Sequence, residues 1–431
     1  MIRNQTFQAE NAPDRNFHFE SRLLTYKAEP DQSAHVQGVF VRAAQLRHIF
    51  IAASTATALA FLAVPADAQP RAISDATDAD PGTFGQLAQG YLQQRADSLT
   101  TSPPTLRSAM SRIKTTRTMA TQTQDDLAAL AEKGRRYTEV DGGYTKAEVD
   151  VKVTDMTVTE QTANVQVNEH TRLYLPFTQQ EIEEGAPEYE ESSLPHTVKF
   201  TKGTDGAWLL SSDKVENEGG PTPTTQVSDT ETPEQVDDGA GSPDEEEGDK
   251  EAGANTDPLP GATPDDVKPT ASADYNFNKM VAYANKYWNN HNDDYRSYGN
   301  DCTNFISQAM YAGGWGPKGG ALYQRTSNKY WFYGPTKFLT SYTWAGAENW
   351  YFFAKKHSKR TKALNNVWKL LKSDVLQADW DRNNNINHTM IVTKKYRGTP
   401  YLTYHSSDTH NKSLKKLLSD HPRAWWYAHR T

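Results

Sequence analysis

A strongly acidic stretch near the middle of the chain constrains the fold more than any other feature, because it cannot belong to a packed core. Residues 216–272 contain sixteen Asp and Glu against two Lys, and most of the others are Pro, Gly, Thr and Ser. Such a stretch buries too little apolar surface to offset the entropy lost on ordering. We therefore predict a disordered, self-repelling acidic linker between a middle domain at 80–215 and a C-terminal domain at 273–431.

The predicted C-terminal domain has the opposite charge. Residues 273–431 carry 23 Lys and Arg against 10 Asp and Glu, and nine of the ten Trp of the chain lie there. The overall net charge of −8 therefore describes neither part of the chain. A basic, aromatic-rich domain is expected to concentrate on anionic polymers.

The N-terminal region has the pattern of an export signal. Arg42 and Arg47 precede an apolar run of sixteen residues at 49–64, and Ala66-Asp67-Ala68 follows it. This order is typical of a signal peptide, and the run is short for a membrane span, which needs ~20 residues. We predict that residues 1–68 are an N-terminal extension and signal peptide, cleaved after Ala68. The mature protein would then be secreted and cell-wall associated, with no stable membrane span; the alternative is an uncleaved signal anchor.

The middle region changes its hydrophobic period from that of helices to that of strands. Residues 83–135 carry apolar residues at helical spacing, whereas after Gly142-Gly143 apolar and polar residues alternate, as they do at 149–153. Helices followed by an antiparallel meander predict a small α+β domain, and the pattern resembles the SnoaL-like cone fold. No nucleophile–base pair is apparent there, and His170 and His196 are interpreted as ordinary strand residues. The role of this domain is not predicted.

The only cysteine of the chain stands at the start of a predicted helix. A polar loop ends at Asp301-Cys302, and from Thr303 onward apolar residues recur at helical spacing until Gly313-Gly314. With one cysteine, no intrachain disulfide can form. Free amide groups and the macrodipole at a helix N-terminus favour a thiolate. We therefore predict that Cys302 is a nucleophile; the alternative is a buried structural thiol.

Two histidines follow on predicted strands of a hairpin. His388 opens a strand at 388–393, and after a turn at 397–400 the returning strand ends at His405. An antiparallel hairpin of this length brings His405 toward the His388 end. A second imidazole, or Asp408 just beyond it, could then hold the first imidazole in its working tautomer.

These segments together resemble a known family. The motifs "YANKYWNNHNDDYRSYGNDCTNFISQAMYAGGW", "SDVLQADW", "NHTMIVTK" and "YLTYHSSDTHNKSL" look like the "putative amidase domain" of secreted bacterial proteins, a relative of the NlpC-type and CHAP papain-like cysteine peptidases. The resemblance covers about residues 273–431. It implies an α+β, papain-like fold with the nucleophile at a helix N-terminus packed on an antiparallel sheet. It also implies that Cys302 is the nucleophile, His388 the base and acid, and His405 the orienting third residue, with Asp408 as the alternative.

Other residues of this region are weaker candidates. The candidate substrate-binding residues are Asp301, Asn304 and Trp315, since polar and aromatic groups line clefts for sugars and peptides. Asp301 is included because the resemblance carries over the "DC" pair of the family. The family tends to Asp before the catalytic His, where this chain has Asn387. The spacing His405-x-x-Asp408-x-His410 could hold a metal, but a metal site would leave the cysteine unexplained. We therefore predict neither a metal nor an organic cofactor.

These features predict a secreted cysteine amidase or peptidase that hydrolyses an amide in cell-wall peptide or in an amino sugar. One alternative is a non-catalytic cell-wall binding or adhesion module. Another is an acyltransferase or transpeptidase, which would use the same acyl-enzyme. The expected partner is peptidoglycan or another peptide amide and not nucleic acid, and the protein is expected to be a monomer.

Overall fold

The structure, a computed structural model, describes residues 80–216, 219–227, 250, 253–259 and 274–431, all of which lie in one unit, Ala72–Thr431. The predicted signal peptide and most of the predicted linker lie outside the described residues. Within the described ranges, no helix combines the length and the apolarity that crossing a membrane would require.

The middle domain consists of helices followed by an antiparallel meander, as the change of period predicted. Its elements are α1 (Pro81–Ser98), α2 (Leu106–Met110), α3 (Arg117–Asp141), β1 (Lys146–Val158), β2 (Thr162–Tyr174), α4 (Gln179–Glu183), β3 (Tyr189–Lys202) and β4 (Trp208–Val215). Thr116 caps the start of α3 through its side chain, and Gly142, at φ 88°, ends it. Alternating burial along β2 packs Val165 and Val167 against Phe84 of α1.

The C-terminal domain places two long helices before a second set of antiparallel strands. Its elements are α5 (Phe277–Tyr287), α6 (Cys302–Ala312), α7 (Tyr342–Ala345), α8 (Ala347–Tyr351), β5 (Lys362–Leu364), β6 (Val375–Asp379), β7 (His388–Tyr396), β8 (Thr399–Tyr404), β9 (Thr409–Ser413), α9 (Leu414–Asp420) and β10 (Trp425–Arg430). The predicted hairpin is β7–β8. Its turn is tighter than predicted, because Arg397 and Gly398 both have positive φ angles and close it in two residues.

The two faces of the C-terminal strands are covered by different helices. Ile391 of β7 packs in one core cluster with Phe305 of α6, whereas its neighbour Met390 packs in another with Leu414 of α9. Successive residues of a strand point to opposite faces. Odd-numbered residues at this end of β7 therefore face α6, and even-numbered ones face α9.

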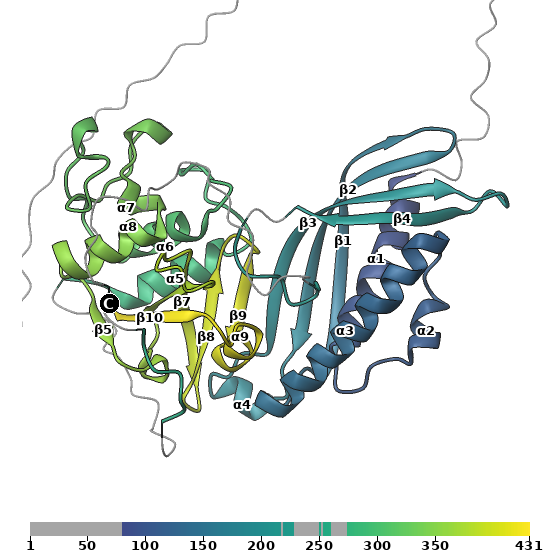
Figure 1. Cartoon of the computed structure of the whole chain (residues 1–431), viewed down its shortest axis with the longest axis horizontal. Helices are drawn as coiled ribbons and strands as arrows, with labels where there is room; N and C mark the ends of the chain where they lie inside the picture. Colours follow the sequence, from purple (N-terminus) through teal and green to yellow (C-terminus); the bar gives the residue numbers. More distant parts are fainter. Residues whose placement is uncertain (1–79, 217–218, 228–249, 251–252, 260–273) are drawn as a thin grey trace, which may run out of the picture. The chain divides into compact units, whose positions relative to one another are not determined.

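One sheet runs through both domains. Its strand order is β1-β2-β3-β9-β8-β7-β6-β10-β5, with β4 also on β3, and β3 lies beside β9 in Figure 1. The pairing of β3 with β9 matches Glu191 with His410 and Ser192 with Thr409. Tyr396 and Tyr401 of the C-terminal hairpin are part of the core cluster of the middle domain. The predicted mixture of helices and antiparallel sheet is confirmed.

Two short pieces of the predicted linker have fixed contacts in the structure. Thr224 and Thr225 are buried, and the backbone oxygen of Thr225 accepts a hydrogen bond from Nε of Arg95 at 3.2 Å. Ala254 donates its backbone N–H to the carbonyl of Trp426 at 2.7 Å. These contacts are polar and long-range, so a composition lacking apolar residues does not reveal them.

Candidate active site around Cys302

Cys302 is the first residue of α6 and is almost fully buried, with 2% of its surface exposed. Its Sγ lies 3.6 Å from Oγ1 of Thr303 and near the backbone N–H of Thr389 on β7. Burial raises the pKa of the thiol to about 11, against the opposing effect of these hydrogen bonds. The helix start alone suggested a lowered pKa. The structure corrects this, because desolvation outweighs the favourable contacts, and the thiol is protonated at neutral pH.

Asp301, the residue before Cys302, joins the helix start to distant parts of the chain. Its Oδ1 accepts hydrogen bonds from the backbone N–H of Tyr298 at 2.9 Å and from Nδ2 of Asn304 at 2.8 Å. Its Oδ2 lies 2.8 Å from Nδ1 of His405. Its own N–H donates to Oγ of Ser406 at 2.9 Å. Asp301 therefore fixes the loop before α6, and it does not cap the helix through its side chain.

The other two candidate substrate-binding residues are enclosed in the core. Asn304 is fully buried and accepts a hydrogen bond from Nε1 of Trp344 at 2.8 Å. Trp315 is also fully buried and is stacked on Trp350, with centroids 5.8 Å apart and an interplanar angle of 6°. Neither side chain is exposed to a substrate in this conformation.

His405 lies on the α6 face of the sheet, beside the start of that helix. Its ring is stacked between Phe305, at a centroid distance of 3.9 Å, and His291, at 4.3 Å. Its Nε2 donates to the carbonyl of Tyr287 at 2.8 Å, and its Nδ1 faces Asp301. Burial disfavours the imidazolium, but Asp408 and Asp301 outweigh burial and raise its pKa. Both nitrogens face acceptors, an arrangement that favours the protonated ring.

His388 points to the opposite face of the sheet. Its ring packs against Trp380 and Tyr404, at centroid distances of 5.7 and 5.2 Å. Burial lowers its pKa to about 3, and neither ring nitrogen has a hydrogen-bond partner among the described residues. Its neighbour Thr389 takes the position facing α6 and bonds Oγ1 of Thr303 at 2.8 Å. The structure therefore brings His405, but not His388, to the start of α6.

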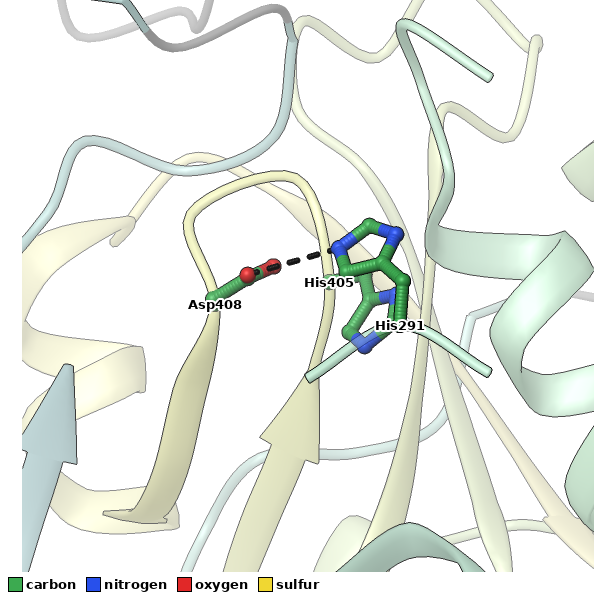
Figure 2. A group of neighbouring side chains, drawn as sticks. All are labelled: His291, His405 and Asp408. Carbon is green, nitrogen blue, oxygen red and sulfur yellow. Dashed lines mark ion pairs between the residues drawn. The ribbon is translucent and has the colours of Figure 1, made fainter. Parts of the chain in front are cut away.

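Asp408 and His405 meet a histidine that the sequence analysis did not single out. Nε2 of His291 lies 3.5 Å from Oδ2 of Asp408, and Figure 2 shows these two residues with His405. Candidate ligand atoms of the three lie within 4.8 Å of one another. His410, the third residue of the spacing-based metal set, instead bonds Glu191 and Asn285. The polar loop after α5 was the only signal for His291.

The geometry of this cluster does not suit a common metal ion. The lone pair of an imidazole nitrogen lies in the plane of the ring, and a bound metal lies in that plane too. The rings of His291 and His405 are stacked, with an interplanar angle of 17°. One ion cannot lie in two nearly parallel, separated planes. Metal binding would also require His405 to give up a hydrogen bond to Asp301 or Tyr287.

Comparisons with known proteins agree with the motifs. Residues 274–428 match the family model described as "Putative amidase domain". "Uncharacterized protein YhbB" of Bacillus subtilis (strain 168) is 31% identical over 118 residues, which cover 27% of this chain and 37% of that protein. The chain thus spans little more than a third of the length of this curated relative.

Solved structures match about a third of the chain at low similarity. The intermembrane space region of the chloroplast protein ARC6 is 11% identical, with a TM-score of 0.20, over 32% of this chain and 95% of that one. Kfla4162 from Kribbella flavida is 14% identical, with a TM-score of 0.21, over 31% and 90%. An "Ntf2 like protein involved in plasmid conjugation" is 15% identical, with a TM-score of 0.18, over 32% and 49%. The family match supports one conclusion: residues 274–428 form an amidase-like domain.

Proposed function

We propose that the C-terminal domain is a cysteine amidase or peptidase and that Cys302 is its nucleophile. The observation that carries this proposal is the arrangement at the start of α6. There, the one thiol of the chain adjoins Asp301, whose carboxylate lies 2.8 Å from Nδ1 of His405. A thiol, an imidazole and a carboxylate are the groups that thiol-based acyl transfer uses.

The charge states of the two histidines suggest different roles for them. The raised pKa of His405 favours its charged form, which cannot accept a further proton, and it suits the orienting and charge-stabilising role that the resemblance implies. His388 is neutral, because burial holds its pKa near 3, so it does not accept a proton at neutral pH in its present environment. We retain His388 as the proposed base because the resemblance implies that role, and its pKa must rise as it leaves this environment.

His388 must change faces before it can act as a base on Cys302. A shift of β7 by one residue against β6 would exchange the faces of His388 and Thr389. The exchange would change the Gln377–Thr389 and Ala378–His388 pairs at this end of the ladder and the hydrogen bond from the N–H of Asn387 to the carbonyl of Ala378. In this proposal the change is confined to the start of β7. In this proposal the present arrangement, with its protonated thiol, is a resting state.

The proposed reaction is acyl transfer through a thioester. The thiol of Cys302 loses its proton to His388, and the thiolate attacks the amide carbonyl. The backbone N–H at the start of α6 contributes to stabilising the tetrahedral oxyanion. His388 then gives the proton to the leaving amine as the C–N bond breaks. Water hydrolyses the thioester and restores the thiol.

The proposed substrate is an amide of the bacterial cell wall, in peptide or on an amino sugar. Two sequence features support it: the export pattern that ends at Ala68, and the 23 basic residues against 10 acidic ones within 273–431. A basic exported domain concentrates on anionic wall polymers. We further propose that the mature protein acts as a monomer outside the cell.

The test is release of fragments from purified cell wall by the mature protein, followed by mass spectrometry. Cys302→Ala and Cys302→Ser should both abolish release without changing the melting temperature, whereas Thr326→Ala, a change at an exposed position, should have no effect. A chelator should leave activity unchanged. Comparable turnover by Cys302→Ala would overturn the cysteine mechanism. Binding without release would favour the adhesion module, and transfer of the acyl group to an added amine would favour the transferase.

A further inference from the structure

The middle domain touches the turn that carries part of the candidate site. The turn Ser406–Asp408 connects β8 to β9, and β9 pairs with β3 of the middle domain. The backbone N–H of Ser193 on β3 donates to the carbonyl of Asp408 at 2.9 Å. This turn also contains Ser406, whose Oγ receives the N–H of Asp301. Two hydrogen bonds, one from Ser193 to Asp408 and one from Asp301 to Ser406, therefore connect the edge of the middle domain to the start of α6 through this turn.

Glu191 of β3 ties the two sides of this region together. Its Oε2 lies 3.1 Å from Nδ1 of His410 on β9, and its Oε1 lies 3.2 Å from Nε2 of His170 and 3.4 Å from Nε of Arg172. Burial opposes ionisation of Glu191, but the hydrogen bonds from the two histidines outweigh it and lower the pKa to about 2. The carboxylate is therefore charged at any physiological pH.

The two histidines bonded to Glu191 also contact the end of α5, which supports His405 through the carbonyl of Tyr287. The ring of Trp288 stacks on His410 at a centroid distance of 5.5 Å and lies 5.8 Å from His170. Trp288 directly follows Tyr287, whose carbonyl accepts the Nε2 proton of His405. Glu191 thus acts on both the turn after His405 and the end of α5 before it.

The segment after β4 adds a third contact. Gly220 has φ +80°, and a Cβ placed on it would lie 2.4 Å from the carbonyl oxygen of Ser406. Only a glycine allows this close approach. A cavity of about 210 Å³ is lined from both domains, by Ser193 and Leu194 on one side and by Asp301, Ser406 and Asp408 on the other. The middle domain therefore forms one wall of a cavity beside Asp301, the residue before the proposed nucleophile.

We propose that the middle domain is a positioning element of the amidase site. Glu191 and Ser193 hold the turn Ser406–Asp408 and the end of α5, so that the Asp301–His405 pair keeps its geometry beside Cys302. This inference rests on the proposed function for its catalytic consequence. Its structural consequence, the environment of the thiol, can be measured without turnover.

The test uses the full mature chain with Glu191→Gln, and Glu188→Gln as a matched control, since Glu188 is exposed and lies just before β3. Two readouts are followed: kcat on cell wall as a function of pH, and the pH profile of alkylation of Cys302, the only cysteine. Glu191→Gln should lower kcat by about tenfold or more, because small misplacements are costly in catalysis. It should also displace the alkylation profile, while the control leaves both unchanged.

A second variant distinguishes a positioning effect from a folding defect of Glu191→Gln. His410→Gln breaks the same contact from the other domain and should shift the alkylation profile in the same direction. If both variants retain the wild-type profile in both readouts, the middle domain does not position the site and the inference is overturned. If the wild-type protein releases no wall fragment but the profiles still shift, the positioning role stands and the proposed function fails.

Discussion

Replacing Asp141 by Asn should destabilise the whole protein, because this carboxylate holds a buried lysine of the other domain. Asp141 ends α3, and its Oδ2 lies 2.7 Å from Nζ of Lys416 on α9. The lysine side chain is fully buried, with none of its surface exposed, and the carboxylate is 11% exposed. Oδ2 also accepts a hydrogen bond from Oγ of Ser413 at 2.7 Å. The variant keeps the shape of the side chain but removes its charge.

The size of the effect follows from what Lys416 can do without its partner. Breaking a buried ion pair from one side costs about 3–5 kcal/mol. If the lysine instead gives up its proton at pH 7, the cost is limited to about 5 kcal/mol, since roughly 3.4 pK units at 1.36 kcal/mol each separate pH 7 from its unperturbed pKa. We therefore expect a loss of about 3–5 kcal/mol in the free energy of unfolding.

The assay is urea denaturation of the wild type, Asp141→Asn, Lys416→Met and the double variant, which closes a mutant cycle. The double variant should recover most of the loss, because Nζ of Lys416 lies over the ring of Tyr144 at 4.3 Å and methionine can pack there. Asp150→Asn, whose carboxylate is 70% exposed, should change stability by less than about 0.5 kcal/mol.

The pH dependence has a definite sign. Burial lowers the pKa of Lys416, and Asp141 opposes this effect, so losing Asp141 lowers the pKa further. The penalty in the variant is then largest at low pH and shrinks as pH rises toward the pKa of an unfolded lysine. A loss below about 1 kcal/mol, or a double variant no more stable than the single one, would refute the reasoning.

The remaining predictions concern histidines. His388→Ala should lower the acylation rate more than His405→Ala, because an orienting residue does not transfer the proton. Asp408→Ala should lower that rate only slightly. If Asp408→Ala lowers the rate on the same amide substrate more than His405→Ala does, the carboxylate is the orienting residue. Burial opposes the charge of His196, but hydrogen bonds to Asp213 and Glu169 outweigh it and raise its pKa to about 10. Its stabilising contribution is thus complete below its ordinary pKa of 6.5 and is lost as pH rises toward 10. The melting-temperature gap between wild type and His196→Asn should narrow over that range, and a constant gap would contradict this.

Several elements of the site could be predicted from the sequence, because local patterns specify them. The helical spacing after Cys302 and the glycines at 313–314 predicted α6, and the structure begins it at Cys302 and ends it at Ala312. The alternation around Arg397-Gly398 predicted the β7–β8 hairpin, which brings His405 back along β7. Helix spacing, strand alternation and turn residues act over a few positions, so a sequence displays them directly.

The tertiary structure alone decided which of these residues meet. The sequence placed His388 at the start of β7, but the pairing with β6 turned its ring away from α6, because each strand position has one face and a shift of one residue exchanges the two. His405 pairs with Asp301, 104 positions earlier. Strand β9 pairs with β3 of the other domain. Such contacts depend on the packing of distant elements. No local hydrophobic period of the sequence encodes these contacts, because polar side chains and backbone groups make them.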